Sequence, residues 1–213
     1  MTDGLSAPAG AAQLLNGQDV SNWTKRDGSP AEWLVEDGIL KVVPKKGDIM
    51  SVETFGDHYL HLEFRCPDMP EATGQAKGNS GVFLLGRYEI QVLDSFGWAK
   101  PGKGDCGAIY NQFAPLSNGC RKPTEWQTYD VAFRIARLDE SGNVRERVRL
   151  TVFHNGICIH NNIELPGVTG APLDTKEGVP GPLLLQDHGD LVQYRNVWVV
   201  PLPAHGSTIY GPE

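Results

Sequence analysis

Residues 148–161 read VRLTVFHNGICIHN, and this stretch is the strongest indicator of fold class in the chain. Two runs rich in β-branched and aromatic residues, 148–154 and 157–161, flank Asn155-Gly156. Asn-Gly between two such runs is a strong signal for a two-residue β-hairpin turn, because both residue types tolerate positive φ. The stretch therefore predicts two antiparallel strands joined by a tight turn.

The same pattern extends along the chain. Asp37-Gly38 predicts a second tight turn, and helical periodicity is almost absent. Further apolar or alternating runs occupy residues 33–36, 39–43, 58–65, 80–85, 88–93, 129–135, 183–186 and 193–201. Turn residues separate these runs at intervals of about 8–12 residues, a spacing typical of β-sandwiches. We predict an all-β jelly-roll sandwich of two antiparallel sheets.

The chain has 213 residues, a length at which an all-β sandwich remains one domain. We therefore expect a single jelly-roll domain over 1–213, with 1–13 as a poorly ordered N-terminal segment. Three stretches rich in Gly and Pro, 66–79, 95–127 and 165–181, are predicted loops. The middle one is much longer than a connection requires, and long loops on a rigid β scaffold often carry function.

Charge and hydropathy argue against nucleic-acid binding and against a transmembrane segment. The net charge is −7, and no block of Lys and Arg forms a nucleic-acid face. Arg145, Arg147 and Arg149 alternate, as expected for one solvated face of a strand. No apolar run approaches the roughly 18–20 residues that span a bilayer. We expect neither a nucleic-acid partner nor a transmembrane segment.

Cysteines and the N-terminus leave questions open. None of the four cysteines forms a CxxC pair, so zinc-ribbon and thioredoxin assignments have no support. Cys106 and Cys120 bracket a loop rich in Gly, Asn and Pro, where a disulfide or two thiols would fit. The first residues lack the basic and apolar regions of a signal peptide, which suits a mature secreted protein and a cytoplasmic one equally.

The segment from Arg87 to Asp94 carries the strongest functional pattern. Glu89 and Gln91 share one strand face, because side chains repeat every two residues. Asp94 has the opposite parity and joins them only if a β-bulge inserts one residue. Two carboxyls about 5–10 Å apart are the usual requirement for glycosidic cleavage. We expect Glu89, Gln91 and Asp94 to line the concave face of one sheet.

This strand resembles the E-x-D-x-x-E strand of laminarinase-type glycoside hydrolases, which are jelly rolls with a bulge at that point. The chain departs from that pattern, since Gln91 replaces the middle acid and Asp94 the last one. An ordinary double displacement cannot simply be carried over.

A wider resemblance covers residues 14–201. It rests on ordered motifs: Leu15-Asn16-Gly17-Gln18-Asp19, Trp33-Leu34-Val35-Glu36-Asp37-Gly38, Asn79-Ser80-Gly81-Val82-Phe83, Tyr88-Glu89-Ile90-Gln91-Val92-Leu93-Asp94, Cys106-Gly107-Ala108-Ile109-Tyr110, Glu125-Trp126-Gln127-Thr128-Tyr129-Asp130 and Leu185-Gln186-Asp187-His188-Gly189. Together they resemble the bacterial 3-keto-disaccharide hydrolase domain family, whose fold is a concanavalin-like jelly roll. The resemblance implies a secreted or periplasmic protein that acts on an oligosaccharide or glycoside oxidised at C3.

Cleavage of such a sugar needs a base, an acid and an electrophile. A C3 ketone acidifies the hydrogen on C2, so the C1 oxygen can leave by elimination, after which water adds back. We assign the acid and base roles to Glu89, Asp94 and His188, since imidazole titrates near neutral pH. Gln186 shares strand parity with His188 and is a candidate for substrate binding.

Further candidates for substrate binding are Arg87, Gln91, Asn79, Tyr110 and Trp126. Arg87 would polarise the ketone or pair with Glu89. Tyr110 and Trp126 would stack on a sugar ring, although Trp126 is also suited to the core. Asn79 would bind hydroxyls or shape a turn.

The remaining histidines have simpler expectations. His58 and His61 are expected at the surface, and His154 is expected to belong to the turn that follows it.

Cofactors and alternative functions stay open at this stage. A divalent ion held by Glu89, Asp94 and His188 would stabilise an enolate, but no metal-ligand spacing is visible. The alternatives to 3-keto-glycoside cleavage are a non-catalytic lectin-like carbohydrate-binding module, an ordinary laminarinase-type glycosidase and a structural domain, all of which jelly rolls support.

Overall fold

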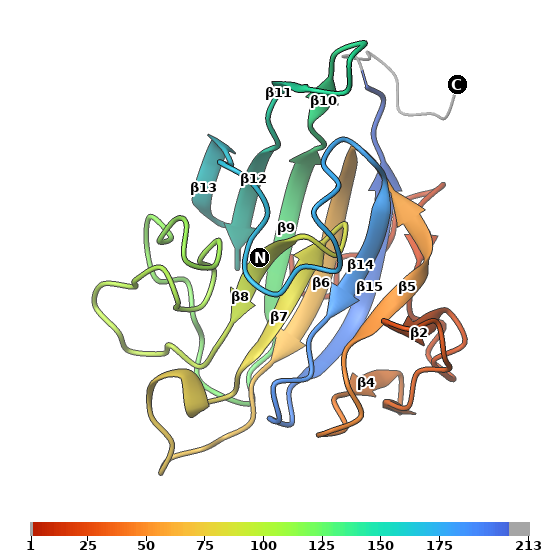
Figure 1. The fold of residues 1–213 in the computed structure, drawn as a ribbon. Coiled ribbons are helices and arrows are strands. Elements are labelled where there is room, and N and C mark those ends of the chain that lie inside the picture. Colours follow the sequence, from red (N-terminus) through yellow and green to blue (C-terminus); the bar gives the residue numbers. More distant parts are fainter. Residues whose placement is uncertain (1, 205–213) are drawn as a thin grey trace.

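Tight turns join antiparallel strands at both predicted positions (Figure 1). The structure is a computed structural model that describes residues 2–204. Asn155 and Gly156 have φ angles of 51° and 80°, and Asp37 and Gly38 have φ angles of 52° and 73°. Positive φ at both central residues matches the twist of the flanking strands. The two hairpin predictions are confirmed.

The larger sheet has eight strands, and every neighbouring pair is antiparallel. Seven of them follow one another across the sheet in the order β13 (Ile157–Glu164), β12 (Arg149–His154), β9 (Gln127–Arg134), β6 (His58–Arg65), β15 (Gln193–Pro201), β4 (Ile39–Lys41) and β3 (Leu34–Glu36). The eighth strand, β1 (Ala12–Gln13), pairs with β15.

The smaller sheet has five antiparallel strands, in the order β2 (Trp23–Lys25), β5 (Ile49–Phe55), β14 (Gly181–Leu185), β7 (Ser80–Leu84) and β8 (Tyr88–Val92). A separate ribbon joins β10 (Arg137–Leu138) to β11 (Val144–Glu146), and a single 3-10 turn, η1, spans Gly74–Ala76. The described chain is thus a two-sheet jelly-roll sandwich, as predicted.

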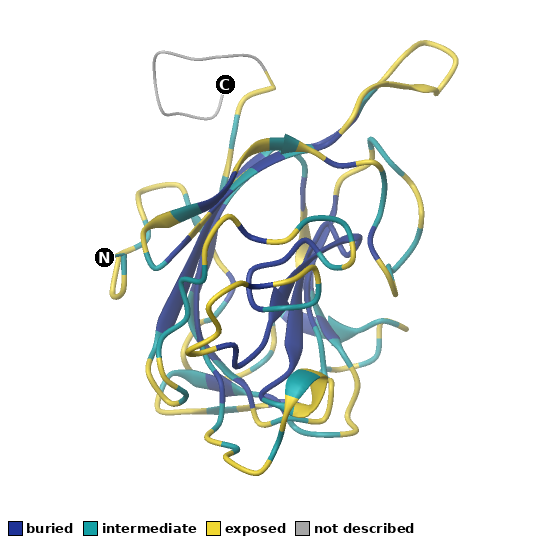
Figure 2. Cartoon of the chain, turned by 90° about the vertical axis from the view of Figure 1, so that its left-hand side faces the viewer, coloured by how far each residue is buried: buried dark blue, intermediate teal, exposed yellow. Residues whose placement is uncertain are grey.

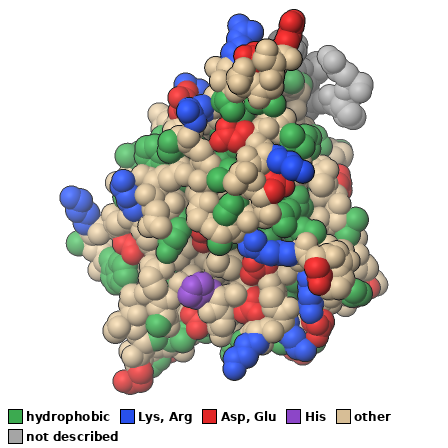
Figure 3. Space-filling view, viewed as in Figure 1, with side chains coloured by type: hydrophobic (Ala, Val, Ile, Leu, Met, Phe, Trp, Pro, Cys, Tyr) green, Lys and Arg blue, Asp and Glu red, His purple; other side chains and the backbone are tan. Residues whose placement is uncertain are grey.

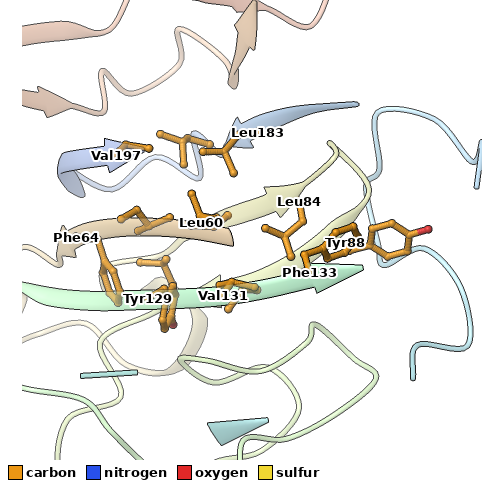
Figure 4. Close-up of a cluster of buried hydrophobic side chains, with 14 of the residues drawn as sticks. Leu60, Phe64, Leu84, Tyr88, Tyr129, Val131, Phe133, Leu183 and Val197 are labelled. Atoms are coloured by element: carbon orange, nitrogen blue, oxygen red, sulfur yellow. The ribbon is translucent and has the colours of Figure 1, made fainter. Parts of the chain in front are cut away.

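The core lies between the two sheets (Figure 4). Leu60, Leu62 and Phe64 alternate along β6 and are fully buried, as strand periodicity predicts. Tyr88 of β8 packs against Phe133 of β9, with ring centroids 5.7 Å apart. Burying a side chain of this size contributes roughly 1.5–3 kcal/mol. Figure 2 shows that burial concentrates in the strands, whereas the connecting loops are largely exposed.

His58 and His61 are not at the surface, so that expectation is wrong. His58 is 2% exposed and stacks on Phe133, with ring centroids 5.0 Å apart. His61 is fully buried, stacks on Trp198 and lies 2.7 Å from an oxygen of Asp130. Alternation does place His61 on the outer face of the sheet, but other parts of the chain cover that face.

The N-terminal segment provides part of this cover. Thr2 donates a hydrogen bond to the Asp130 carboxylate, and the backbone N–H of Gly4 donates to Glu63 at 2.8 Å. Asn196 of β15 donates to the carbonyl oxygen of Leu5 at 2.8 Å. The segment expected to be poorly ordered therefore makes specific contacts in the structure, from residue 2 onward.

Surface charges of both signs are interspersed on the face drawn in Figure 3. No broad basic patch is visible on that face, which agrees with the charge pattern of the sequence. None of the helical segments in residues 2–204 is long and apolar enough to cross a bilayer.

Candidate active site

A cavity of about 230 Å³ opens beside β7 and β8. Tyr88, Ile90 and Val92 of β8 point into the core, so Glu89 and Gln91 point to the opposite face of the small sheet. Nine residues line the cavity: Gln75, Asn79, Glu89, Gln91, Tyr110, Gly170, Ala171, Gln186 and His188. Six of them are predicted site residues, contributed by strand β8 and by segments that follow β6, β8 and β14.

Glu89 is the buried acid of this cavity. Glu89 is 4% exposed, and its carboxyl has no hydrogen-bond partner among the described residues. Burial, together with the negative charge of Asp48, raises the pKa of Glu89 to about 8. A side chain on Gly81 would place its Cβ 2.6 Å from a Glu89 oxygen, so glycine is needed to make room for the carboxyl. Glu89 therefore retains its proton at neutral pH.

Asp48 is a contributor that sequence analysis missed. Its carboxylate accepts hydrogen bonds from Arg26 at 2.7 Å and from the backbone of Asp187 at 2.9 Å. Arg26 also donates to the carbonyl oxygen of Ala171, a residue of the cavity wall. The ion pair thus ties the start of the chain to the cavity, and no local motif indicates it because its members lie far apart in sequence.

Three amide side chains form one wall of the cavity. The Gln91 side-chain amide donates to Asn79 at 3.1 Å and to Gln75 at 3.2 Å. Asn79 in turn donates to the carbonyl oxygen of Gln75 at 2.7 Å. Both hydrogens of the Gln91 amide are therefore engaged within the protein. The predicted binding residues Asn79 and Gln91 mainly hold the shape of the site.

Tyr110, Gln186 and His188 offer polar groups to the cavity. None of their side chains has a hydrogen-bond partner among the described residues. The backbone N–H of Tyr110 donates to the carbonyl oxygen of Glu89 at 3.1 Å, which places the long loop along the edge of β8. The backbone N–H of Gln186 donates to the carbonyl oxygen of Gly81 at 3.0 Å, which fixes the position of Gln186 beside β7. These three side chains are free to contact a ligand.

Asp94 lies outside the lining of this cavity. The ladder between β7 and β8 is regular, and β8 ends at Val92. Asp94 is 3% exposed; one of its oxygens lies 3.1 Å from the Lys77 ammonium, and the other accepts the N–H of Phe96. The predicted grouping of Asp94 with Glu89 and His188 is therefore not seen, because the Lys77 ammonium holds its carboxylate elsewhere.

Arg87 and Trp126 also contact other parts of the chain. Arg87 donates to Asp174 at 2.6 Å and to the carbonyl oxygen of Val179 at 2.7 Å, so it anchors the 165–180 loop and does not pair with Glu89. The guanidinium carbons of Arg65 and Arg195 lie 4.6 and 4.2 Å from the centroid of the Trp126 ring. Neither residue lines the cavity.

The comparison with known families agrees with the ordered motifs. The model of the 3-keto-alpha-glucoside-1,2-lyase-like domain matches residues 10–200. The chain belongs to this family. Membership gives it a carbohydrate-active role. None of the curated proteins compared with the chain matches it.

Three solved structures from Parabacteroides distasonis ATCC 8503, each described as a candidate glycosyl hydrolase, share the fold of this chain. One is 38% identical, with a TM-score of 0.85, over 92% of this chain and 86% of the other. A second is 19% identical, with a TM-score of 0.67, over 91% and 94% of the two chains. The third is 21% identical, with a TM-score of 0.63, over 90% and 99%.

The chain has a second, larger hollow of about 420 Å³. It is lined by Arg65, Cys66, Pro67, Asp68, Thr124, Leu191 and Gln193. Its lining contains one exposed acid and no histidine, whereas the cavity of Glu89 combines a buried acid with an imidazole. The cavity of Glu89 is therefore the better candidate for an active site.

The expected ion-binding set of Glu89, Asp94 and His188 is not assembled, because Asp94 is held at Lys77. Among the described residues, the metal-compatible group of three side chains is instead Cys106, Cys120 and His154. This group does not line the cavity.

Proposed function

We propose that the protein cleaves the glycosidic bond of 3-keto-glycosides or 3-keto-disaccharides by C2 proton abstraction, elimination and hydration. The observation that carries this proposal is the pairing of one buried, proton-retaining carboxyl, Glu89, with the imidazole of His188 in a single cavity. Membership of a family described as 3-keto-alpha-glucoside-1,2-lyase-like supports the same chemistry.

The reaction needs one base, one acid and hydrogen-bond donors that stabilise charge on the C3 oxygen. A C3 ketone makes the C2 hydrogen acidic, and abstraction of that hydrogen generates an enolate whose charge rests on the C3 oxygen. Collapse of the enolate forms a C1–C2 double bond and breaks the bond between C1 and the leaving oxygen. Water then adds across the double bond, with hydroxide to C1 and a proton to C2.

The cavity offers a group for each step. His188 takes the C2 proton and becomes imidazolium. Glu89 gives its proton to the departing C1 oxygen, since burial keeps this carboxyl protonated at neutral pH. Tyr110 and Gln186 donate hydrogen bonds to sugar oxygens, including the oxygen that carries the enolate charge.

An ordinary laminarinase-type glycosidase fits the site less well. That chemistry requires two carboxyls on either side of the scissile bond. Among residues 2–204, Glu89 is the one carboxyl that lines the cavity, while Asp94 is paired with Lys77. A hydrolytic outcome for the complete reaction is supported by the 38% identical candidate glycosyl hydrolase. We further propose that the protein acts outside the cytoplasm, as a secreted or periplasmic enzyme.

A matched pair of substrates tests the reaction. The purified protein is incubated with a 3-keto-glycoside and with the same glycoside before oxidation, in deuterium oxide. We expect cleavage of the ketone alone, with deuterium incorporated at C2 of the product. Equal cleavage of the unoxidised glycoside would reject the elimination route, and tight binding of either sugar without turnover would favour the lectin-like alternative.

Variants test the roles of the residues. Glu89→Gln and His188→Asn should each lower turnover by roughly 10²–10⁴-fold, the usual contribution of a positioned acid or base. Sugar affinity should change much less, because each group acts mainly in the transition state. Asp94→Asn and the exposed Glu53→Gln serve as controls and should retain turnover within a few fold. Loss of turnover in Asp94→Asn equal to that in Glu89→Gln would show that this assignment of roles is wrong.

A further inference from the structure

A second cluster of reactive side chains lies away from the sugar cavity. Cys106 and Cys120 both belong to the long loop between β8 and β9, whereas His154 is the last residue of β12 in the large sheet. Two sulfur atoms and one imidazole nitrogen of these residues lie within 4.8 Å of one another. Cys106 is 2% exposed and His154 is fully buried, so this cluster is sheltered from solvent.

The tautomer of His154 follows from its neighbours. The side-chain oxygen of Gln127 accepts the backbone N–H of Arg121 at 3.0 Å, so the atom at that position is an oxygen and not the amide nitrogen. The same oxygen lies 3.0 Å from His154 Nε2, which must therefore carry the hydrogen and donate it. His154 Nδ1 is left with a bare lone pair.

That lone pair is buried and has no hydrogen-bond partner within the described chain. A Cβ on Gly119 would lie 2.9 Å from His154 Nδ1, so the atom faces the backbone beside Cys120. Leaving a buried polar atom unsatisfied costs about 1–3 kcal/mol. A neutral imidazole with a bare lone pair is the form in which histidine binds a metal ion.

The two cysteines are suited to the same ion. Both are thiols in the structure, and the Cys106 sulfur lies 3.2 Å from the Tyr129 hydroxyl oxygen. A disulfide between them would leave His154 Nδ1 unsatisfied, whereas a cation held by both sulfurs and by Nδ1 would satisfy that nitrogen. Thiolate and imidazole ligands select zinc and similar soft ions, and Gln127 orients the imidazole as an outer partner usually does.

We propose that Cys106, Cys120 and His154 bind a thiophilic metal ion, for which Zn²⁺ is the natural probe. The ion fastens the loop that carries Tyr110 to strand β12 and so holds one wall of the sugar cavity in place. Tyr129 links the two regions, because its hydroxyl lies 3.2 Å from the Cys106 sulfur and donates to the Gln91 carbonyl oxygen at 2.7 Å. This site is independent of the proposed reaction.

Zn²⁺ titration of the reduced full chain tests the proposal. Calorimetry and elemental analysis should give one Zn²⁺ per chain, and substitution with Co²⁺ should produce the thiolate-to-cobalt absorption band. Cys120→Ser and His154→Gln should weaken binding by about tenfold or more. Cys158→Ser, at a half-buried cysteine outside the cluster, is the matched control and should bind as the parent does.

Two results would overturn the proposal. One is that the folded, reduced parent binds no stoichiometric Zn²⁺. This includes the case in which the parent is isolated with a Cys106–Cys120 disulfide and takes up no ion after the disulfide is reduced. The other is undiminished binding by Cys120→Ser, whose fold is checked by circular dichroism. A competition arm with Cu⁺ distinguishes which soft ion the three ligands prefer.

Discussion

Glu89 acquires its chemical character from its surroundings. The carboxyl is buried beside Gly81, lacks a hydrogen-bond donor among the described residues and experiences the negative charge of Asp48. Desolvation disfavours the carboxylate, and so does a neighbouring anion. The same properties that make Glu89 a proton donor at neutral pH also connect it to the stability of the whole chain.

That connection predicts a pH dependence of unfolding. The pKa of Glu89 is raised from 4.5 to about 8 on folding, so between these values the folded chain retains a proton that the unfolded chain has lost. The contribution of this group to stability is fully present below the unfolded pKa and is lost as pH rises through about 8. Its decline is at most about 1.4 kcal/mol per pH unit.

Glu89→Gln removes the titrating carboxyl and should therefore reduce the decline of the free energy of unfolding with rising pH. Urea unfolding at several pH values should show the variant gaining stability relative to the parent by several kcal/mol between about pH 5 and pH 9. Glu53→Gln, at an exposed position, should run parallel to the parent. Parallel curves for Glu89→Gln as well would contradict the raised pKa.

At the scale of single elements, the edge of β8 is completed by loops and not by another strand. Gln91 exchanges backbone hydrogen bonds with Ala108 and Gly107, at 2.9 Å each, and the Glu89 N–H donates to the Thr169 hydroxyl at 2.9 Å. Loop backbone thus satisfies groups that an edge strand would leave open. This arrangement is what brings Tyr110 to the cavity.

The hairpin between β12 and β13 should depend on Gly156. A φ of 80° is unfavourable for residues that carry a Cβ atom. A Cβ at position 156 would nevertheless have open space, with no atom within 4 Å. Gly156→Ala should therefore cost only backbone strain, about 1–2 kcal/mol in the free energy of unfolding. Gly56→Ala, where the space is open and φ is not positive, should change stability by less than about 0.5 kcal/mol. Equal effects in urea unfolding would argue against the turn geometry.

Across the whole molecule, the two outer faces of the sandwich have different roles. The small sheet carries the cavity, whereas the large sheet buries a charged network under the N-terminal segment. In that network Arg195 donates to Glu63 at 2.7 Å, and His61 lies 2.7 Å from Asp130. Burial by the N-terminal segment makes these charges part of the scaffold.

Removal of residues 1–9 should therefore destabilise the chain without changing the cavity. The deletion removes Thr2 and Gly4, which donate hydrogen bonds to buried carboxylates, and each such bond contributes roughly 1.5–3 kcal/mol. We expect a loss of about 3–6 kcal/mol in urea unfolding, with sugar affinity retained. Asp3→Asn, which weakens only the partly exposed ion pairs with Arg195 and Arg121, should cost less than about 1 kcal/mol. Unchanged stability of the deletion would show that the segment does not support the network.

The sequence alone was enough to predict the sandwich fold, the tight turns and the family. Turn residues such as Asn155-Gly156 act through their own φ angles, and alternation along a strand depends only on neighbouring residues. Parity likewise placed Glu89 and Gln91 on one face, and the residues of the family's motifs include Tyr110 and His188 of the cavity.

The tertiary structure was needed for every property that depends on distant partners. The Asp94 carboxylate lies beside the Lys77 ammonium. Burial raises the pKa of Glu89, and so does the charge of Asp48, which lies 41 positions away in sequence. His61 is buried by parts of the chain far from it in sequence. His154, at the end of β12, lies close to two cysteines of the loop between β8 and β9. Burial, charge–charge distance and hydrogen-bond partners arise through space, so local patterns carry no record of them.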